Sequence, residues 1–131
     1  MTVGAAKRVP RGRVIAIDVW RAEDLSGNGP AALSANGRAE GVSGQIEVRT
    51  VDARALDLPD ASVDVVLSLL CLHNIEPATE RARALREIAR VLKPGGRALI
   101  ADSIPRPPAM PSLSATRGFV SAARSMGCAW P

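Results

Sequence analysis

Four segments of the chain carry the hydrophobic pattern of β-strands. Residues 13–18, 63–70 and 97–102 are almost continuously apolar, and residues 45–51 alternate between apolar and polar positions. Strands that are apolar on both faces are typical of a parallel sheet that helices cover on both sides. The pattern therefore predicts four strands of a parallel sheet.

Helical patterns occupy two of the connections between these segments. Pro30 suits the first turn of a helix that stops near Gly41, and Pro77 opens a longer helix. The apolar face of the longer helix comprises Ala78, Ala82, Leu85, Ile88, Ala89 and Leu92, and the other side comprises Arg81, Arg83, Glu87 and Arg90. Residues 93–96, Lys-Pro-Gly-Gly, are expected to form the turn into the last strand. This alternation predicts an α/β fold with a doubly wound, mostly parallel sheet.

The composition limits the partners that the chain can bind. Its 131 residues suffice for one domain, and only 2% of them are aromatic, so the chain lacks stacking platforms for single-stranded nucleic acid. The net charge of +4 comes from basic residues scattered along the chain, and we expect no nucleic-acid partner. We expect no membrane partner either, because no apolar segment approaches the roughly 20 residues that cross a bilayer.

The two cysteines, Cys71 and Cys128, do not predict a disulfide framework. Cys71 lies in an apolar run, so we expect a small buried hydrophobic residue there. The segment 1–13 has no long apolar stretch and is not expected to be a secretory signal. These features predict a reducing, cytoplasmic setting.

Two acidic residues follow predicted strands, where ligands bind in open parallel sheets. Asp18 ends the first apolar segment, and its two carboxylate oxygens could accept both hydroxyls of a ribose. Asp52 and Ala53 follow the second segment, where a side-chain acceptor beside a backbone N–H suits the edge of an adenine. The alternatives are that Asp18 caps the loop that follows it and that Asp52 is an ordinary turn residue.

The third such position runs from Ser68 to Asn74 and contains His73, the only histidine of the chain. His73 could act on a substrate as a base or a hydrogen-bond partner, or could be a loop or cap residue. No metal site is expected, because Cys71 and His73 have no second pair of ligands to complete a tetrahedron.

Three stretches that occur in this order carry a family resemblance. They are RVIAIDVW, VRTVDARALDLPDASVDVVLSLLCLHNI and ALREIARVLKPGGRALIAD. Together they resemble the Rossmann-like, class I S-adenosylmethionine-dependent methyltransferases, and especially the small-molecule branch that includes quinone-biosynthesis enzymes. The resemblance covers about residues 5–102. It implies S-adenosylmethionine as the cofactor and a small molecule as the methyl acceptor.

The resemblance also implies roles for single residues. Asp18 would hold the cofactor ribose, Val19 would line the adenine, and Asp52 with Ala53 would read the adenine edge. The backbone around Ser68 would meet the methionine part of the cofactor. His73 and Asn74 would face the acceptor, and the turn at residues 93–96 would be structural.

One part of the family pattern is not found in this sequence. The glycine-rich loop lies about 20 residues before the ribose-binding acid, which would put it before Met1 or at its edge. We therefore expect the chain to begin inside the first crossover helix, at residues 3–9, with the central first strand and the glycine loop missing. Inner strand edges would then lack backbone partners, which favours self-association through exposed sheet edges. We expect a partial methyltransferase core at residues 1–104, and a divergent, Pro-rich tail at residues 105–131 with at most a short helix near residues 120–126.

These features leave alternative functions open. Methyl transfer depends mainly on alignment, so the lack of a strong nucleophile is no objection to an enzyme. The alternative is an inactive, truncated methyltransferase remnant or a partner-binding pseudoenzyme. A nicotinamide-dependent oxidoreductase is disfavoured, because the chain has no tyrosine and hence no Tyr-x-x-x-Lys pair.

Overall fold

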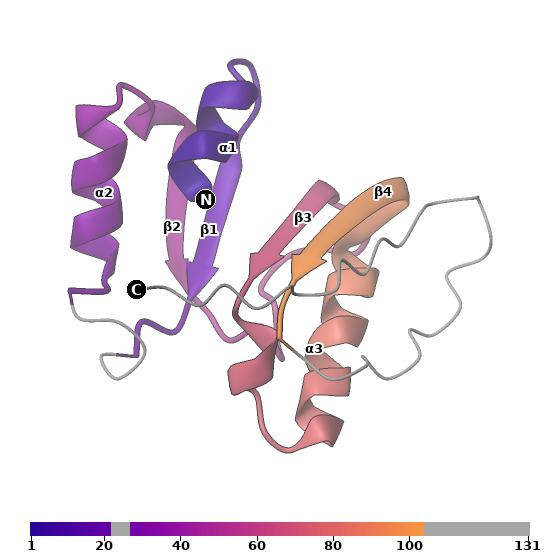
Figure 1. Cartoon of the computed structure of the whole chain (residues 1–131). Coiled ribbons are helices and arrows are strands. Elements are labelled where there is room, and N and C mark those ends of the chain that lie inside the picture. Colours follow the sequence, from indigo (N-terminus) through magenta and orange to yellow (C-terminus); the bar gives the residue numbers. More distant parts are fainter. Residues whose placement is uncertain (22–26, 104–131) are drawn as a thin grey trace. The chain divides into compact units, whose positions relative to one another are not determined.

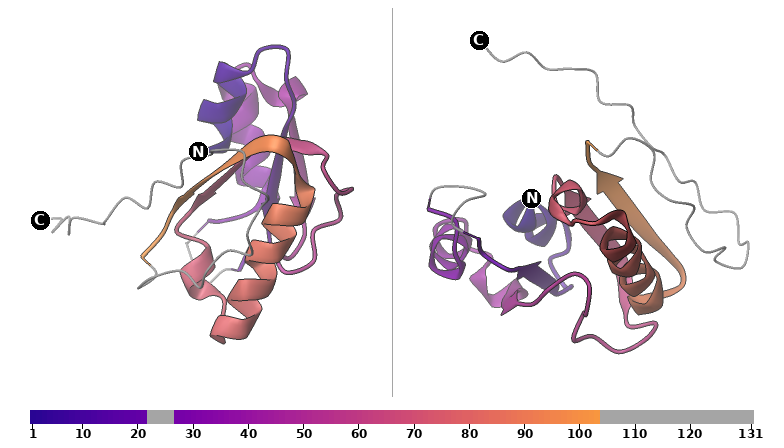
Figure 2. Two further views of the ribbon diagram at one scale, coloured as in Figure 1. Left: turned by 90° about the vertical axis from the view of Figure 1, so that its right-hand side faces the viewer. Right: turned by 90° about the horizontal axis from the view of Figure 1, so that it is seen from below.

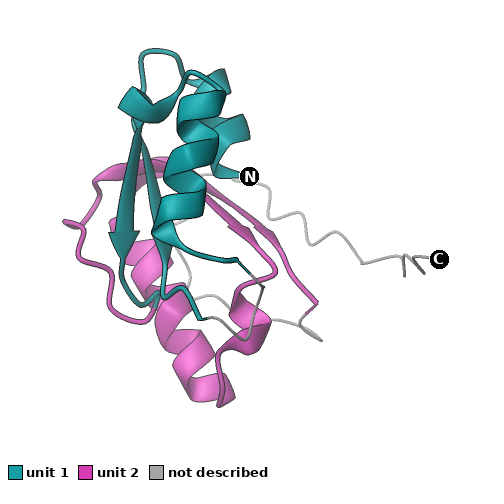
Figure 3. Cartoon of the chain, turned by 90° about the vertical axis from the view of Figure 1, so that its left-hand side faces the viewer, with its two compact units in different colours: residues 1–53 teal, residues 54–131 magenta. Residues whose placement is uncertain are grey.

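The computed structural model describes residues 1–21 and 27–103, which form helices and parallel strands (Figure 1). The chain divides into two compact units, Met1–Ala53 and Arg54–Pro131 (Figure 3). The predicted tail at residues 105–131, with its possible helix near residues 120–126, lies outside the described residues. Each unit is a helix-and-strand assembly around one pair of parallel strands.

The first unit places two helices beside its pair of strands. Its elements are α1 (Thr2–Arg8), β1 (Val14–Asp18), α2 (Pro30–Ala39), the 3-10 helix η1 (Ser43–Gln45) and β2 (Ile46–Thr50). β1 and β2 are parallel, with Val14 opposite Ile46 and Asp18 opposite Thr50. The helix α1 lies where the first crossover helix was expected.

The predicted ends of α2 are confirmed. Pro30 stands in the first turn, where its missing N–H costs nothing. Gly41 has a positive φ of 69° just after the helix, and its N–H donates to the carbonyl of Arg38 at 3.1 Å. The small core of this unit includes Ala6, Ala16 and Val42.

The second unit packs one long helix against its strands (Figure 2). Its elements are β3 (Val63–Leu69), the 3-10 helix η2 (Leu72–Asn74), α3 (Ala78–Val91) and β4 (Leu92–Ala101). β3 and β4 are parallel, with Leu67 opposite Leu99. The helix buries Ala84, Leu85, Ile88 and Val91. Of the predicted apolar face, Leu85 and Ile88 are buried, Ala82 and Ala89 are half-buried, and Ala78 is exposed. Leu92 is buried but already belongs to β4, and Ala84 and Val91 are buried although they were not predicted to be.

The four strands form two separate two-stranded sheets in the described residues, where the sequence pattern predicted four strands of one sheet. β1 and β3 each have one strand neighbour in this part of the chain. The α/β class and the parallel pairing are confirmed.

The Lys-Pro-Gly-Gly segment differs from its prediction as a plain turn before the strand. β4 already begins at Leu92, which pairs with Val63, and the next pair joins Val65 to Arg97. Residues 93–96 therefore bulge out opposite the single residue Asp64. The bulge is closed by an ion pair between Lys93 Nζ and Asp64 Oδ1 at 2.9 Å.

One face of the second sheet is exposed. Four large apolar side chains are 39–61% exposed and alternate along the strands: Val65, Leu67, Leu69 and Leu99. We call these four residues the uncovered face. Parallel sheets normally have helices on both faces, so this apolar surface is unusual for the fold.

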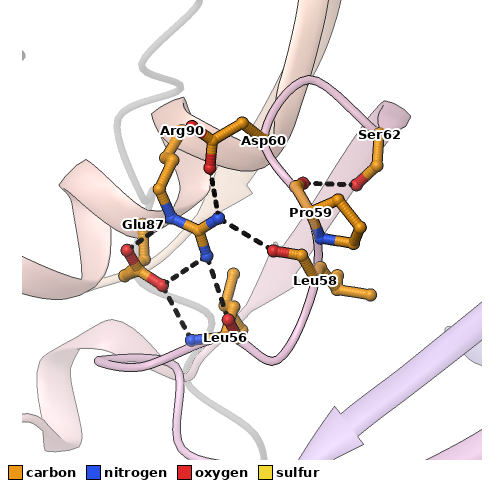
Figure 4. A network of polar contacts seen from close by, with 7 residues as sticks. All are labelled: Leu56, Leu58, Pro59, Asp60, Ser62, Glu87 and Arg90. Atoms are coloured by element: carbon orange, nitrogen blue, oxygen red, sulfur yellow. Dashed lines mark hydrogen bonds and ion pairs between the residues drawn. The ribbon is translucent and has the colours of Figure 1, made fainter.

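The loop from Leu56 to Ser62 is fastened to α3 by Arg90 (Figure 4). The Arg90 guanidinium donates to the carbonyls of Leu56 and Leu58 at 2.9 and 2.8 Å, and to Asp60 and Glu87. Glu87 also accepts from the Leu56 N–H at 2.8 Å. The hydrogen bond from Arg90 holds the pKa of Glu87 below its usual range. Glu87 and Arg90 lie on the side of the helix opposite its apolar face, as predicted, and they are half-buried because a loop distant in sequence covers them.

Candidate functional site

Asp18 ends β1 and is half-buried. Its Oδ1 accepts a hydrogen bond from the backbone N–H of Trp20 at 2.8 Å, so the carboxylate caps the turn that follows the strand. Its carbonyl accepts from the Val51 N–H at 3.2 Å. A carboxylate has about four acceptor positions, so capping through Oδ1 leaves capacity for a ligand.

Asp52 and Ala53 follow β2 and are half-buried. Because Asp18 pairs with Thr50, the carboxyl ends of β1 and β2 lie next to each other. The first unit thus brings Asp18 and Asp52 to one edge of its sheet, as the sequence predicted. Two carboxylates at this edge can accept hydrogen bonds from the hydroxyl and amino groups of a nucleoside.

The residues after Asp18 form a tight, strained turn. Val19 is 41% exposed. Trp20 has a φ of +56°, which is rare for a bulky residue. Its indole Nε1 is buried and has no hydrogen-bond partner among the described residues. Trp20 was not predicted from the sequence, because no sequence pattern indicates a positive φ at this position.

The second unit carries the other predicted residues. Ser68 lies in β3 opposite Ile100 and is half-buried. His73 and Asn74 belong to η2, with Asn74 exposed and His73 half-exposed. Cys71 is exposed rather than buried, because β3 ends at Leu69 and the chain turns away before the cysteine.

Asp102 is the polar centre of this end of the second sheet. It follows β4, and its side chain is only 4% exposed. Its Oδ1 lies 2.7 Å from Nδ1 of His73, and its Oδ2 accepts from the N–H groups of Cys71 and Leu72 at 3.1 and 2.7 Å. Burial raises the pKa of Asp102, but the hydrogen bonds from His73, Leu72 and Ser103 together hold that pKa below its usual range.

Sequence reasoning missed Asp102 as a site residue. The signal was present, because Asp102 follows an apolar strand in the same way as Asp18 does. What the sequence did not show was the partner, since His73 lies 29 residues earlier in the chain.

Two surface hollows lie elsewhere in the first unit. One of about 370 Å³ is lined by residues of α1 and α2, including Val3, Leu33 and Glu40. Another of about 230 Å³ lies between α2 and β2. None of the predicted site residues lines either hollow.

The described residues contain neither a metal-binding cluster nor a membrane-spanning helix. In residues 1–21 and 27–103, no group of three His, Cys, Asp or Glu side chains is arranged to hold a metal ion. No helix in this part of the structure has the length and apolar character needed to span a membrane.

A family model described as a methyltransferase domain matches residues 2–100 of this chain. The chain belongs to this family. The α/β architecture and parallel strands agree with the class I, S-adenosylmethionine-dependent methyltransferases, whose cofactor is S-adenosylmethionine.

Curated relatives of this methyltransferase domain are longer proteins. A ubiquinone/menaquinone biosynthesis C-methyltransferase, UbiE, of Hydrogenovibrio crunogenus is 35% identical over 103 residues, which are 78% of this chain and 37% of the relative. The UbiE of Vibrio campbellii is 38% identical over 65 residues, or 50% of this chain and 24% of the relative. The chain therefore spans between about a quarter and somewhat over a third of the length of these relatives.

Solved structures show the same fold. A methyltransferase of Aquifex aeolicus that depends on S-adenosylmethionine superposes with a TM-score of 0.54 at 25% identity, covering 71% of this chain and 47% of that protein. The cyclase SpnF superposes with a TM-score of 0.56 at 32% identity, covering 72% of this chain and 33% of that protein. Because a cyclase is among these neighbours, the fold alone does not settle the reaction.

Proposed function

We propose that this chain takes part in methyl transfer from S-adenosylmethionine to a small-molecule acceptor. The observation that carries the proposal is the placement of Asp18 and Asp52 at the carboxyl ends of adjacent parallel strands. The UbiE relatives are C-methyltransferases of ubiquinone and menaquinone biosynthesis, which supports an acceptor of small-molecule type. When bound, the cofactor supplies an electrophilic methyl group on a sulfonium.

The residues of the first unit suit the adenosine half of this cofactor. Asp18 would accept hydrogen bonds from the ribose hydroxyls, and Asp52 with the Ala53 N–H would bind the adenine edge. The partly exposed Val19 would offer apolar contact to the base. The backbone at Ser68 would meet the methionine part, and His73 and Asn74 of the second unit would face the acceptor.

Calorimetric titration with S-adenosylhomocysteine tests this function through two substitutions at one position. Asp18→Asn keeps an oxygen for the Trp20 N–H but loses the charge, whereas Asp18→Ala loses both. We expect the alanine variant to bind about 10- to 100-fold more weakly, the range expected for lost hydrogen bonds to a charged group. The asparagine variant should also bind more weakly but keep the wild-type melting temperature.

Asp64→Asn is the matched control, because Asp64 is an exposed aspartate near the beginning of β3, whereas Asp18 lies at the carboxyl end of β1. It should leave the affinity unchanged. If the wild-type chain shows no binding at millimolar concentrations, the alternative of an inactive remnant or a partner-binding pseudoenzyme is correct. Equal affinity in the wild type and the three variants would show that Asp18 does not bind the cofactor.

We also propose that two copies of the chain associate through the second sheet. Its strands present open edges in the described part of the chain, and the uncovered face adds exposed apolar area. A second copy offers the same edge and face, so a twofold pairing would bury both. Light scattering should show a dimer for the wild type and a monomer for Leu67→Lys. Val9→Lys, at an apolar residue of similar exposure in the first unit, should stay dimeric, and a monomeric wild type would contradict the proposal.

A further inference from the structure

The contact between His73 and Asp102 lies where the two strands of the second sheet end. Nδ1 of His73 and Oδ1 of Asp102 are 2.7 Å apart, a short charge-assisted distance. The Asp102 side chain is almost fully buried, whereas the His73 side chain is 35% exposed. One side of the imidazole is thus fixed to the protein, and the other side reaches the surface.

The hydrogen bonds of Asp102 determine where the proton of His73 lies. Among the described residues, every partner of this carboxylate other than His73 is a backbone N–H, from Cys71, Leu72 and Ser103, so each of these contacts needs an acceptor. An ionised carboxylate accepts only, and therefore Nδ1 of His73 must carry the proton in that contact. In the neutral imidazole, Nε2 is then left with its lone pair. No described residue makes a hydrogen bond to Nε2.

The backbone is strained to form this arrangement. Leu70 has a φ of +49°, a conformation that a leucine rarely adopts, and it follows directly after β3. The turn at Leu70 is held by its N–H, which donates to the carbonyl of Ala101 at 2.8 Å. Beyond it, the next two N–H groups point at Asp102. Strain of this kind persists where the surrounding structure fixes it, and it concentrates at functional sites.

We propose that Nε2 of His73 is the general base of the methyl transfer and that Asp102 is the residue that positions it. This inference rests on the function proposed above and extends it to the acceptor. A base is useful only if the acceptor must lose a proton. The acceptor class is therefore a hydroxyl-bearing aromatic or a similarly acidic O–H or C–H compound, rather than a thioether or tertiary amine.

The proposed step balances without a further reactant. The acceptor atom bonds to the methyl carbon while the carbon–sulfur bond breaks, and the electron pair of that bond stays on sulfur. The proton of the acceptor moves to Nε2 of His73. The Asp102 carboxylate stabilises the imidazolium that results, and solvent can take up the proton because His73 is partly exposed.

Nuclear magnetic resonance of the imidazole nitrogens tests the proton placement without turnover. His73 is the only histidine, so its resonances need no assignment by mutation. At a pH where the imidazole is neutral, we expect the shifts of protonated Nδ1 and unprotonated Nε2. In Asp102→Asn, we expect the amide oxygen to accept from the Cys71 and Leu72 N–H groups, which turns the amide NH2 toward the ring and makes Nδ1 the acceptor, so the two shifts should exchange. Asp64→Asn should leave them unchanged. A wild type with protonated Nε2 would overturn the proposal.

A His73–Asp102 hydrogen bond with only a structural role would also leave the proton on Nδ1. A second measurement therefore separates the structural role from the catalytic role. Phenol and anisole form a matched pair of probes that differ in having or lacking the hydroxyl proton. With S-adenosylhomocysteine present, phenol should shift the Nε2 resonance and anisole should not. Equal responses to both, or no response to phenol, would overturn the base assignment. Failure of S-adenosylhomocysteine to bind would instead count against the proposed function, because the proton placement is measured without it.

Discussion

Replacing Leu72 with alanine should lower the free energy of unfolding by about 2–5 kcal/mol, the range for emptying a fully packed leucine position. Leu72 is 1% exposed and is one of the two largest fully buried side chains in the described residues. It belongs to η2, which packs against α3. Chemical denaturation followed by far-UV dichroism measures the change.

The matched control for this prediction is Leu99→Ala. Leu99 carries the same side chain on β4 but is 61% exposed, so removing its methyl groups leaves no cavity. Because the uncovered face is proposed to pair with a second copy, we measure both variants at a protein concentration where the chain is monomeric, and there we expect the effect of Leu99→Ala on the unfolding free energy to stay within about 0.5 kcal/mol. Similar losses in the two variants would show that η2 is not packed as described. Leu72→Ala should also shift the His73 resonances, because the Leu72 N–H donates a hydrogen bond to Asp102, which contacts His73.

The strands could be predicted closely because their hydrophobic pattern is local. The segment 13–18 corresponds to β1 at Val14–Asp18, and the segment 63–70 corresponds to β3 at Val63–Leu69. Proline and glycine positions fixed the ends of α2 for the same reason, since a missing N–H or a positive φ acts on the residue that carries it. Local sequence patterns therefore suffice to predict the elements and their order along the chain.

Features that depend on partners distant in sequence could not be predicted. Arg90 has the polarity of a solvated helix face, and only the loop at residues 56–60 makes it a half-buried donor. Cys71 has apolar neighbours in sequence, but the turn at Leu70 exposes it. In each case a tertiary contact or a backbone turn overrides the tendency of the residue type.

The candidate site shows the same division. Asp18 was found from its place at the end of an apolar strand, and the structure adds the bond to the Trp20 N–H that the sequence could not show. Asp102 occupies an equivalent place, but its importance follows from a buried contact with His73. The position of a strand-end acid can thus be predicted from the sequence, whereas its contacts depend on which groups the fold brings to it.

The bulge at residues 93–96 is where a single added methyl group should have a large effect. A Cβ at Gly96 would lie 2.9 Å from the carbonyl oxygen of Lys93 and 3.1 Å from that of Asp64. Both are backbone atoms of the paired strands, so neither can rotate away. We expect Gly96→Ala to lower the free energy of unfolding by about 1–3 kcal/mol, the usual cost of overpacking.

Gly44→Ala makes the comparison specific to the bulge. A Cβ at Gly44, in η1 of the first unit, would meet no atom within 4 Å. Its effect should be neutral or stabilising by up to about 1 kcal/mol, because alanine reduces the entropy of the unfolded chain. Denaturant titrations of the two variants measure the difference directly. Equal stability of both would mean that the Lys-Pro-Gly-Gly segment is an open turn, as its sequence alone suggests, and not a close-packed bulge. The predicted difference would instead show that glycine is required at Gly96 because the two strands approach each other closely there.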